Sequence, residues 1–200
     1  MVGDDLGADV AATYRRSLTR WIADVERIGD AWTAPTPCSD WDVRQLVNHV
    51  VGEDRWTGPL VSGMTIAEVG DALDGDLLGD DPKLAARAAV EEAMAAVGHN
   101  VPDGGIVHLS YGQESLAEYL WQLTADHLIH GWDLAAATGQ DRSLDTELVD
   151  AVGTWFAQRE PMYRSAGVVG ARPEGAIGGS PGADLLIAFG RDPAWTATAG

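Results

Sequence analysis

Three side chains of the kinds that bind metal ions stand on otherwise apolar, helix-like stretches: His49, Asp126 and His130. Asp126 and His130 are four residues apart, so on a helix they are rotated by roughly 40° and separated by about 6 Å along the axis. That separation is small enough for both to bind one ion. His49 must then come from a different helix. The spacing therefore predicts a three-ligand metal site between two helices.

Two neighbours of these residues leave the ligand set open. His127 lies on the same apolar stripe as His130 and could replace Asp126, which would give a three-histidine site. Spacing alone does not choose between them, and the other role for His127 is packing or a hydrogen bond near the ion. Asp133 is a candidate partner for the second ring nitrogen of His130, because metal-bound imidazoles usually donate their other N–H to such a group. Without Asp126 and His130, a histidine such as His49 on an apolar helix face would more often be a hydrogen-bonded core residue than a metal ligand.

The elements that must position these residues are mainly helical, because apolar residues recur every three to four positions along most of the chain. Ser39 and Ser180 are expected as helix N-caps, with Pro181 opening the last helix. A short strand is expected at Ile106–Leu109. We expect helices over residues 8–28, from Ser39 to about 56, over 82–97, 114–138 and 145–158, and a short last one ending near 189.

Four long helices joined by loops of unequal length predict a four-helix bundle, a fold that builds metal sites from facing side chains. The chain has 200 residues, enough for one good-sized core. We expect a metal-binding helical bundle over residues 1–140, with residues 141–200 as a helical extension packed on the same domain. The glycine- and proline-rich segment 159–182 receives no role.

Charge and composition exclude several classes of partner. A net charge of -18 and a pI near 4.3 argue against binding to nucleic acid or to an anionic membrane. No segment reaches the roughly 18 to 20 apolar residues of a membrane span, and the first residues lack a signal-peptide pattern. The single cysteine, Cys38, agrees with a reducing compartment. We expect a cytoplasmic protein that binds small molecules; a homodimer is left open.

Several other residues could contribute to a site. Cys38 precedes a helix and could be a nucleophile, although a small packed residue is the favoured interpretation. His99 and His108 lie in an irregular stretch from which they could face the metal, and nothing in the sequence fixes their direction. The core is the expected location of three tryptophans: Trp41, Trp56 and Trp132.

Three stretches of the sequence are distinctive as motifs. They are Pro37-Cys38-Ser39-Asp40-Trp41-Asp42-Val43-Arg44-Gln45-Leu46-Val47-Asn48-His49, Asp126-x-x-x-His130-Gly131-Trp132-Asp133-Leu134-Ala135 and Phe189-Gly190-Arg191-Asp192-Pro193. Together they resemble the mycothiol-dependent maleylpyruvate isomerase-like branch of the DinB superfamily. The resemblance implies a DinB-like up-down-down-up four-helix bundle, with a divalent metal, commonly zinc, held by His49, Asp126 and His130. The best-known isomerase has a larger C-terminal domain and a glutamate at the position of Asp126.

A metal ion with three protein ligands keeps a coordination position open, as catalytic sites do. A thiol bound there would lose its proton at neutral pH. The leading hypothesis is a metal-dependent thiol S-transferase or thiol-assisted isomerase, in which a mycothiol-like thiolate attacks a small electrophilic substrate. Zinc is expected, and nickel, manganese or ferrous iron would also suit two histidines and a carboxylate. The alternatives are a hydrolase that activates water and a metal- or small-ligand-binding module without turnover.

Overall fold

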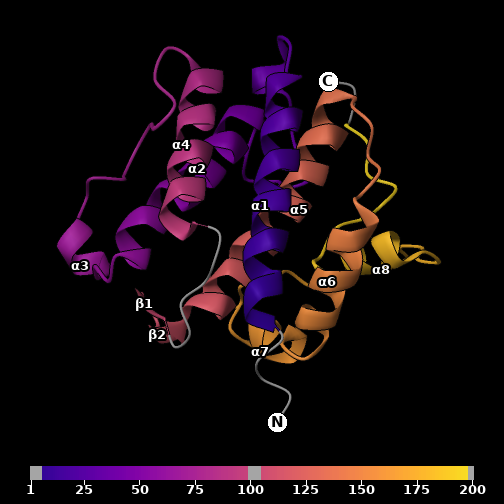
Figure 1. Ribbon diagram of the computed structural model, residues 1–200. Coiled ribbons are helices and arrows are strands. Elements are labelled where there is room, and N and C mark those ends of the chain that lie inside the picture. The colour runs from indigo at the N-terminus through magenta and orange to yellow at the C-terminus, as the bar shows by residue number, and fades with distance from the viewer. Residues whose placement is uncertain (1–5, 99–104, 198–200) are drawn as a thin grey trace.

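The computed structural model describes residues 6–98 and 105–197, and the mainly α fold expected from the sequence is confirmed there (Figure 1). Four long helices form the bundle: α1 (Leu6–Glu26), α2 (Val43–Val61), α4 (Pro82–Val97) and α5 (Leu116–Thr138). The shorter elements are η1 (Ala31–Thr33), α3 (Ile66–Val69), α6 (Thr146–Ala157), α7 (Glu160–Ser165), α8 (Pro181–Ala188) and the antiparallel strands β1 (Ile106–Leu109) and β2 (Gly112–Ser115).

Contacts between helix ends fix the directions of the four long helices. Lys83, at the start of α4, donates to the carbonyl of Glu26 at the end of α1, so these helices are antiparallel. Gln140, just after α5, donates to the carbonyl of Asp24 near the end of α1, so α1 and α5 run in the same direction. The long connection through α3 returns the chain to the end of the bundle where α2 began (Figure 1). The bundle is therefore up-down-down-up.

The turn before α2 differs from the sequence expectation. Ser39 is not the N-cap; Asp42 is, because its side chain accepts a hydrogen bond from the backbone N–H of Gln45 at 2.8 Å. The Gln45 side chain in turn accepts from the Asp42 N–H at 2.9 Å, which completes a capping box. The hydroxyl of Thr36 donates to the carbonyl of Trp41 and holds the residues between them in a turn. Helix can begin only after that turn.

Other boundaries moved for similar local reasons. Residues 112–115 pair with β1, so α5 begins after them, with Ser115 as its N-cap. α2 runs past Trp56 to Val61, and α7, in the glycine- and proline-rich segment 159–182, is a helix beyond those expected. The expected cap Ser180 is confirmed, since its side chain accepts from the N–H of Ala183. No helix that the structure describes is both long and apolar enough to cross a membrane.

The C-terminal residues 141–197 extend the bundle through α6, which packs on α5 and against α8. One carboxylate of α5 also joins α5 to α6. Glu118 accepts hydrogen bonds from the indole of Trp155, the guanidinium of Arg159 and the hydroxyl of Tyr163. We therefore propose that the extension belongs to the same domain as the bundle.

The capping box of α2 generates a stability prediction. Asp42→Ala should lower the free energy of unfolding by about 1 kcal/mol, because the first turn of α2 loses its side-chain acceptor. Urea denaturation of the metal-free protein measures the change. Asp40→Ala is the matched control, since Asp40 is exposed and its side chain makes no hydrogen bond within the described residues. Equal losses in both variants would contradict the capping role.

Candidate metal centre

His49, Asp126 and His130 meet between α2 and α5. The Nε2 atom of His49 lies 3.2 Å from Oδ2 of Asp126, and the Nε2 atom of His130 lies 3.3 Å from Oδ1 of the same carboxylate. The His49 and Asp126 side chains are 29% and 30% exposed, whereas His130 is 8% exposed. One carboxylate thus faces two imidazoles, and the site opens to solvent on the side of His49 and Asp126.

Trp41, in the turn before α2, covers both rings. Its ring stacks on His49 with centroids 4.6 Å apart and lies 5.7 Å from the ring of His130. Trp41 also packs against the core, as expected. The turn before α2 therefore places the aromatic ring of Trp41 against one side of the site.

The three side chains fit one small cation. Ligand atoms at tetrahedral corners about 2.0 Å from zinc lie about 3.3 Å from one another. Each imidazole nitrogen lies at about this distance from one oxygen of Asp126, 3.2 Å from Oδ2 for His49 and 3.3 Å from Oδ1 for His130, and one ligand atom from each of the three residues lies within 4.8 Å of the others. No fourth His, Cys, Asp or Glu among the described residues belongs to this group. We therefore propose these three residues as ligands of a site with an open position.

A second group of ligand type, Cys38, His130 and Asp133, uses the other side of the His130 ring. The positively charged guanidinium of Arg191 already occupies that place. Nη2 of Arg191 is 2.8 Å from Oδ2 of Asp133 and 2.9 Å from Sγ of Cys38. Because like charges repel strongly in a site shielded from water, the guanidinium disfavours a metal ion in this group. Cys38, which is half-buried, thus lies beside the candidate metal centre.

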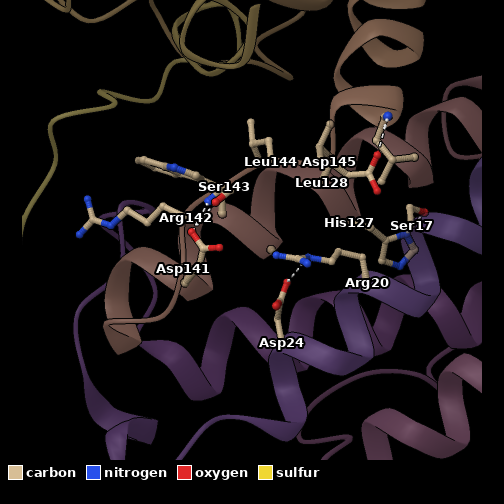
Figure 2. Close-up of a pocket in the computed structure, with 14 residues that line it drawn as sticks. Ser17, Arg20, Asp24, His127, Leu128, Asp141, Arg142, Ser143, Leu144 and Asp145 are labelled. Carbon is tan, nitrogen blue, oxygen red and sulfur yellow. Dashed lines mark hydrogen bonds and ion pairs between the residues drawn. The ribbon is translucent and has the colours of Figure 1, made fainter. Parts of the chain in front are cut away.

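His127 points away from the site and into the bundle. Its Nε2 lies 2.9 Å from Oδ1 of Asp54, with both side chains buried, and its Nδ1 lies 3.4 Å from Oγ of Ser17. Figure 2 shows His127 and Ser17 together beside a cavity of about 20 Å³ that Asp24 also lines. Such a cavity has room for about one water molecule, and not for a substrate. Both nitrogens of His127 have neighbours other than Asp126, which disfavours the three-histidine alternative.

Asp133 lies where a partner of His130 should lie. Its Oδ2 is 3.0 Å from Nδ1 of His130, and the carboxylate is fully buried. Burial raises the pKa of Asp133, but hydrogen bonds from His130 and Arg191 outweigh it and leave that pKa below its usual value. Asp133 therefore stays ionised and holds the ring of His130 with Nε2 directed at Asp126.

His130 and Asp126 shift each other's ionisation in opposite directions. Burial lowers the pKa of His130, but the Asp126 carboxylate outweighs it, and the pKa is raised well above its usual value. Burial raises the pKa of Asp126, but His130 and His49 outweigh it, and this pKa is well below its usual value. In the metal-free protein His130 is thus an imidazolium paired with an ionised Asp126.

Glu53 is a neighbour of the site that the sequence analysis missed. It follows His49 by one helical turn on α2, a spacing that places both side chains on one face. Burial raises the pKa of Glu53, and the negative charge of Asp126 raises it further. The four-residue spacing from His49 could have indicated this residue.

His108, the other histidine among the described residues, does not join the group. His108 lies in β1, where its backbone bridges to that of Thr65. Hydrogen bonds from the N–H and the hydroxyl of Thr65 lower the pKa of Glu68, and the nearby His108 adds to this effect. His99 lies outside the described residues.

Comparisons with known proteins agree with the motifs. A family model described as the mycothiol maleylpyruvate isomerase N-terminal domain matches residues 11–135, which include the three proposed ligands. Two uncharacterized proteins of Mycobacterium tuberculosis, from strains CDC 1551 and H37Rv, are each 33% identical over 188 residues, covering 90% of this chain and 96% of the relative. No solved structure gives a significant match.

The ligand assignment predicts which substitutions lose metal. His49→Ala, Asp126→Ala and His130→Ala should each remove most of the bound zinc, measured by elemental analysis after dialysis. His127→Ala should keep the zinc but lower the free energy of unfolding by about 1–3 kcal/mol, because it leaves the buried Asp54 carboxylate without its imidazole partner. Zinc lost from His127→Ala and kept by Asp126→Ala would favour the three-histidine site.

The raised pKa of His130 predicts proton release on metal binding. The ion needs a neutral imidazole, so binding near pH 7 should release about one proton, and affinity should rise with pH until the raised pKa of His130 is passed. Without metal, the stability of the fold depends on pH in the opposite direction. The ion pair stabilises the fold below the unfolded-state pKa of about 6.5, and this contribution is lost as the pH rises through the raised value. Calorimetry in two buffers of different ionisation enthalpy counts the proton; identical heats would contradict the assignment.

Proposed function

The chain belongs to the family of mycothiol maleylpyruvate isomerase N-terminal domains, and we propose that it is a metal-dependent enzyme that joins a low-molecular-weight thiol to a small electrophile. The product is a thioether if the sulfur stays, and an isomer of the substrate if the sulfur leaves again. The observation that carries the proposal is the open side of the site, where two of the three ligand side chains remain partly exposed.

The donor set suits this chemistry. Two imidazoles and one carboxylate would hold zinc, and would also accept nickel, manganese or ferrous iron. A divalent ion in the site would favour the thiolate form of a bound thiol at neutral pH. With Asp126 as its one anionic ligand, the occupied centre would keep a net positive charge and attract an anionic sulfur.

Glu53 is the residue that we assign to the thiol proton. In the metal-free protein, burial and the neighbouring Asp126 raise its pKa, and its spacing of one helical turn from His49 puts it on the same face of α2 as that proposed ligand. As the S–H bond breaks, a carboxylate oxygen of Glu53 takes the proton. After the sulfur has bonded to one carbon of an activated alkene, Glu53 can return that proton to the adjacent carbon. No oxidant or other reactant is needed.

The position of Trp41 supports the proposed function because its ring could pack against the substrate. Its ring lies over His49 and His130 and offers a flat apolar surface beside the open position. A small unsaturated acid or similar carbon skeleton could pack there with its electrophilic carbon facing the sulfur, while the ring keeps water from the same space.

The proposal predicts thiol consumption that depends on metal and on Glu53. Zinc-loaded protein should speed the loss of mycothiol in the presence of maleylpyruvate or monobromobimane, followed by thiol titration and product mass, and chelation should abolish this. Glu53→Gln should lower the rate about 100-fold while zinc content stays unchanged, because only the proton acceptor is removed. Asp126→Ala should lose both activity and zinc.

Cys38→Ser is the control that separates an external thiol from a protein nucleophile. It should retain activity, because the reacting sulfur belongs to the cosubstrate. Substrate trapped on Cys38, seen by intact mass, would contradict the mechanism. Ester or amide hydrolysis without added thiol would favour the hydrolase, and inactivity in all assays with zinc bound would favour the binding module.

A further inference from the structure

Arg191 follows α8 and reaches back to the partner of a proposed ligand 58 residues earlier in the chain. Its Nη2 lies 2.8 Å from Oδ2 of Asp133, and its Nε lies 3.2 Å from Oδ1. The guanidinium side chain is only 16% exposed, and the Asp133 carboxylate is fully buried. A two-pronged contact of this kind fixes both the position and the rotation of a carboxylate.

The end of α8 is built to aim Arg191 inward. Gly190 has a φ of 79°, which side-chain-bearing residues rarely adopt, and a Cβ there would meet the carbonyl oxygen of Gly170 at 3.1 Å. The backbone N–H of Arg191 then bonds the carbonyl of Leu186 at 2.8 Å, which closes the helix end. The side chain also donates to the carbonyl of Phe189 at 3.1 Å. These contacts hold the guanidinium against α5.

Asp133 is shared between Arg191 and His130. Its Oδ2 accepts from Nη2 of Arg191 and also lies 3.0 Å from Nδ1 of His130. His130 is thereby held with Nε2 facing Asp126. The contacts form one continuous chain from the C-terminal segment to the open side of the site: Arg191, Asp133, His130, Asp126 and His49.

We propose that Arg191 is a positioning residue of the metal centre, which holds Asp133 so that His130 is oriented for ligation. The inference rests on the proposed function for its role toward a metal. Without Arg191, the buried Asp133 carboxylate would keep the imidazole of His130 and the thiol of Cys38, 3.7 Å away, as partners, but no cationic group outside the proposed ligands, and it could rotate toward water or the ion. The centre would therefore be incomplete without a residue that lies outside the family-matched residues 11–135.

Arg142 supplies a matched control. It also lies in the C-terminal extension, donates to the carbonyls of Trp195 and Ala136, and lies over the ring of Trp132. It thus ties the extension to α5, as Arg191 does, and has no contact with Asp133 or the proposed ligands among the interactions of the described residues. Loss of Arg142 tests for weakened docking of the extension alone.

The test compares full-length Arg191→Met, Arg191→Lys and Arg142→Met. Zinc affinity is measured by competition with a chromophoric chelator, and the visible spectrum of bound Co²⁺ reports the ligand geometry. Arg191→Met should weaken zinc about 10- to 100-fold and alter the Co²⁺ spectrum. Arg191→Lys should recover part of the affinity, since a lysine keeps the positive charge but cannot make the two-pronged contact with Asp133. Arg142→Met should keep both wild-type affinity and spectrum.

A metal-free measurement separates this proposal from the proposed function. The ring ¹⁵N resonances of His130 should shift in Arg191→Met and stay unchanged in Arg142→Met. If the wild type binds neither Zn²⁺ nor Co²⁺, the metal assignment fails, and these resonances still decide the positioning role. Unchanged His130 resonances, or equal loss of zinc in both methionine variants, would overturn it. Should Arg191→Met not fold, Arg191→Lys against Arg142→Lys makes the same comparison.

Discussion

Two carboxylate–imidazole pairs cross between α2 and α5, and the arrangement of the site depends on them. α2 contributes His49 to one pair and Asp54 to the other, while α5 contributes Asp126 and then His127. The pair near the surface keeps one edge open, and the inner pair is fully buried. Because a buried carboxylate without its partner is costly, sliding α2 along α5 would break both pairs at once. The inner pair thus fixes the register that the outer pair needs.

The two carboxylate–imidazole pairs also determine where the charged groups of the site lie. Ionised Asp126 and Asp133 flank the two nitrogens of one imidazole ring, and each has a further partner of its own. Asp126 lies toward solvent and next to His49, whereas Asp133 lies in the interior and against Arg191. Asp126 can therefore exchange the proton of His130 for an incoming cation on the open side of the ring, whereas the charge of Asp133 is already balanced by Arg191.

A feature could be predicted from the sequence when the contacts that determine it lie between residues close together in the chain. The Asp126/His130 pair, the long helices and the Ser180 cap follow from spacings of three or four residues, which helical geometry decides. Ser39 and Asp42 are both good caps, and only the tertiary turn held by Thr36 selects between them. His127 adjoins Asp126, so its direction could be learned only from Asp54, on another helix. Arg191 was visible only as part of a motif, since its partner is 58 residues away.

The turn at Gly190 also bears on the order in which the protein is made. A chain leaves the ribosome N-terminus first, so α2 and α5 can meet, and bring His49 to Asp126, before residue 191 has been synthesised. Asp133 then lacks its cation for the time needed to make and fold those 58 residues. The charge of the buried Asp133 is thus balanced only when the segment after α8 has been made and has docked against α5.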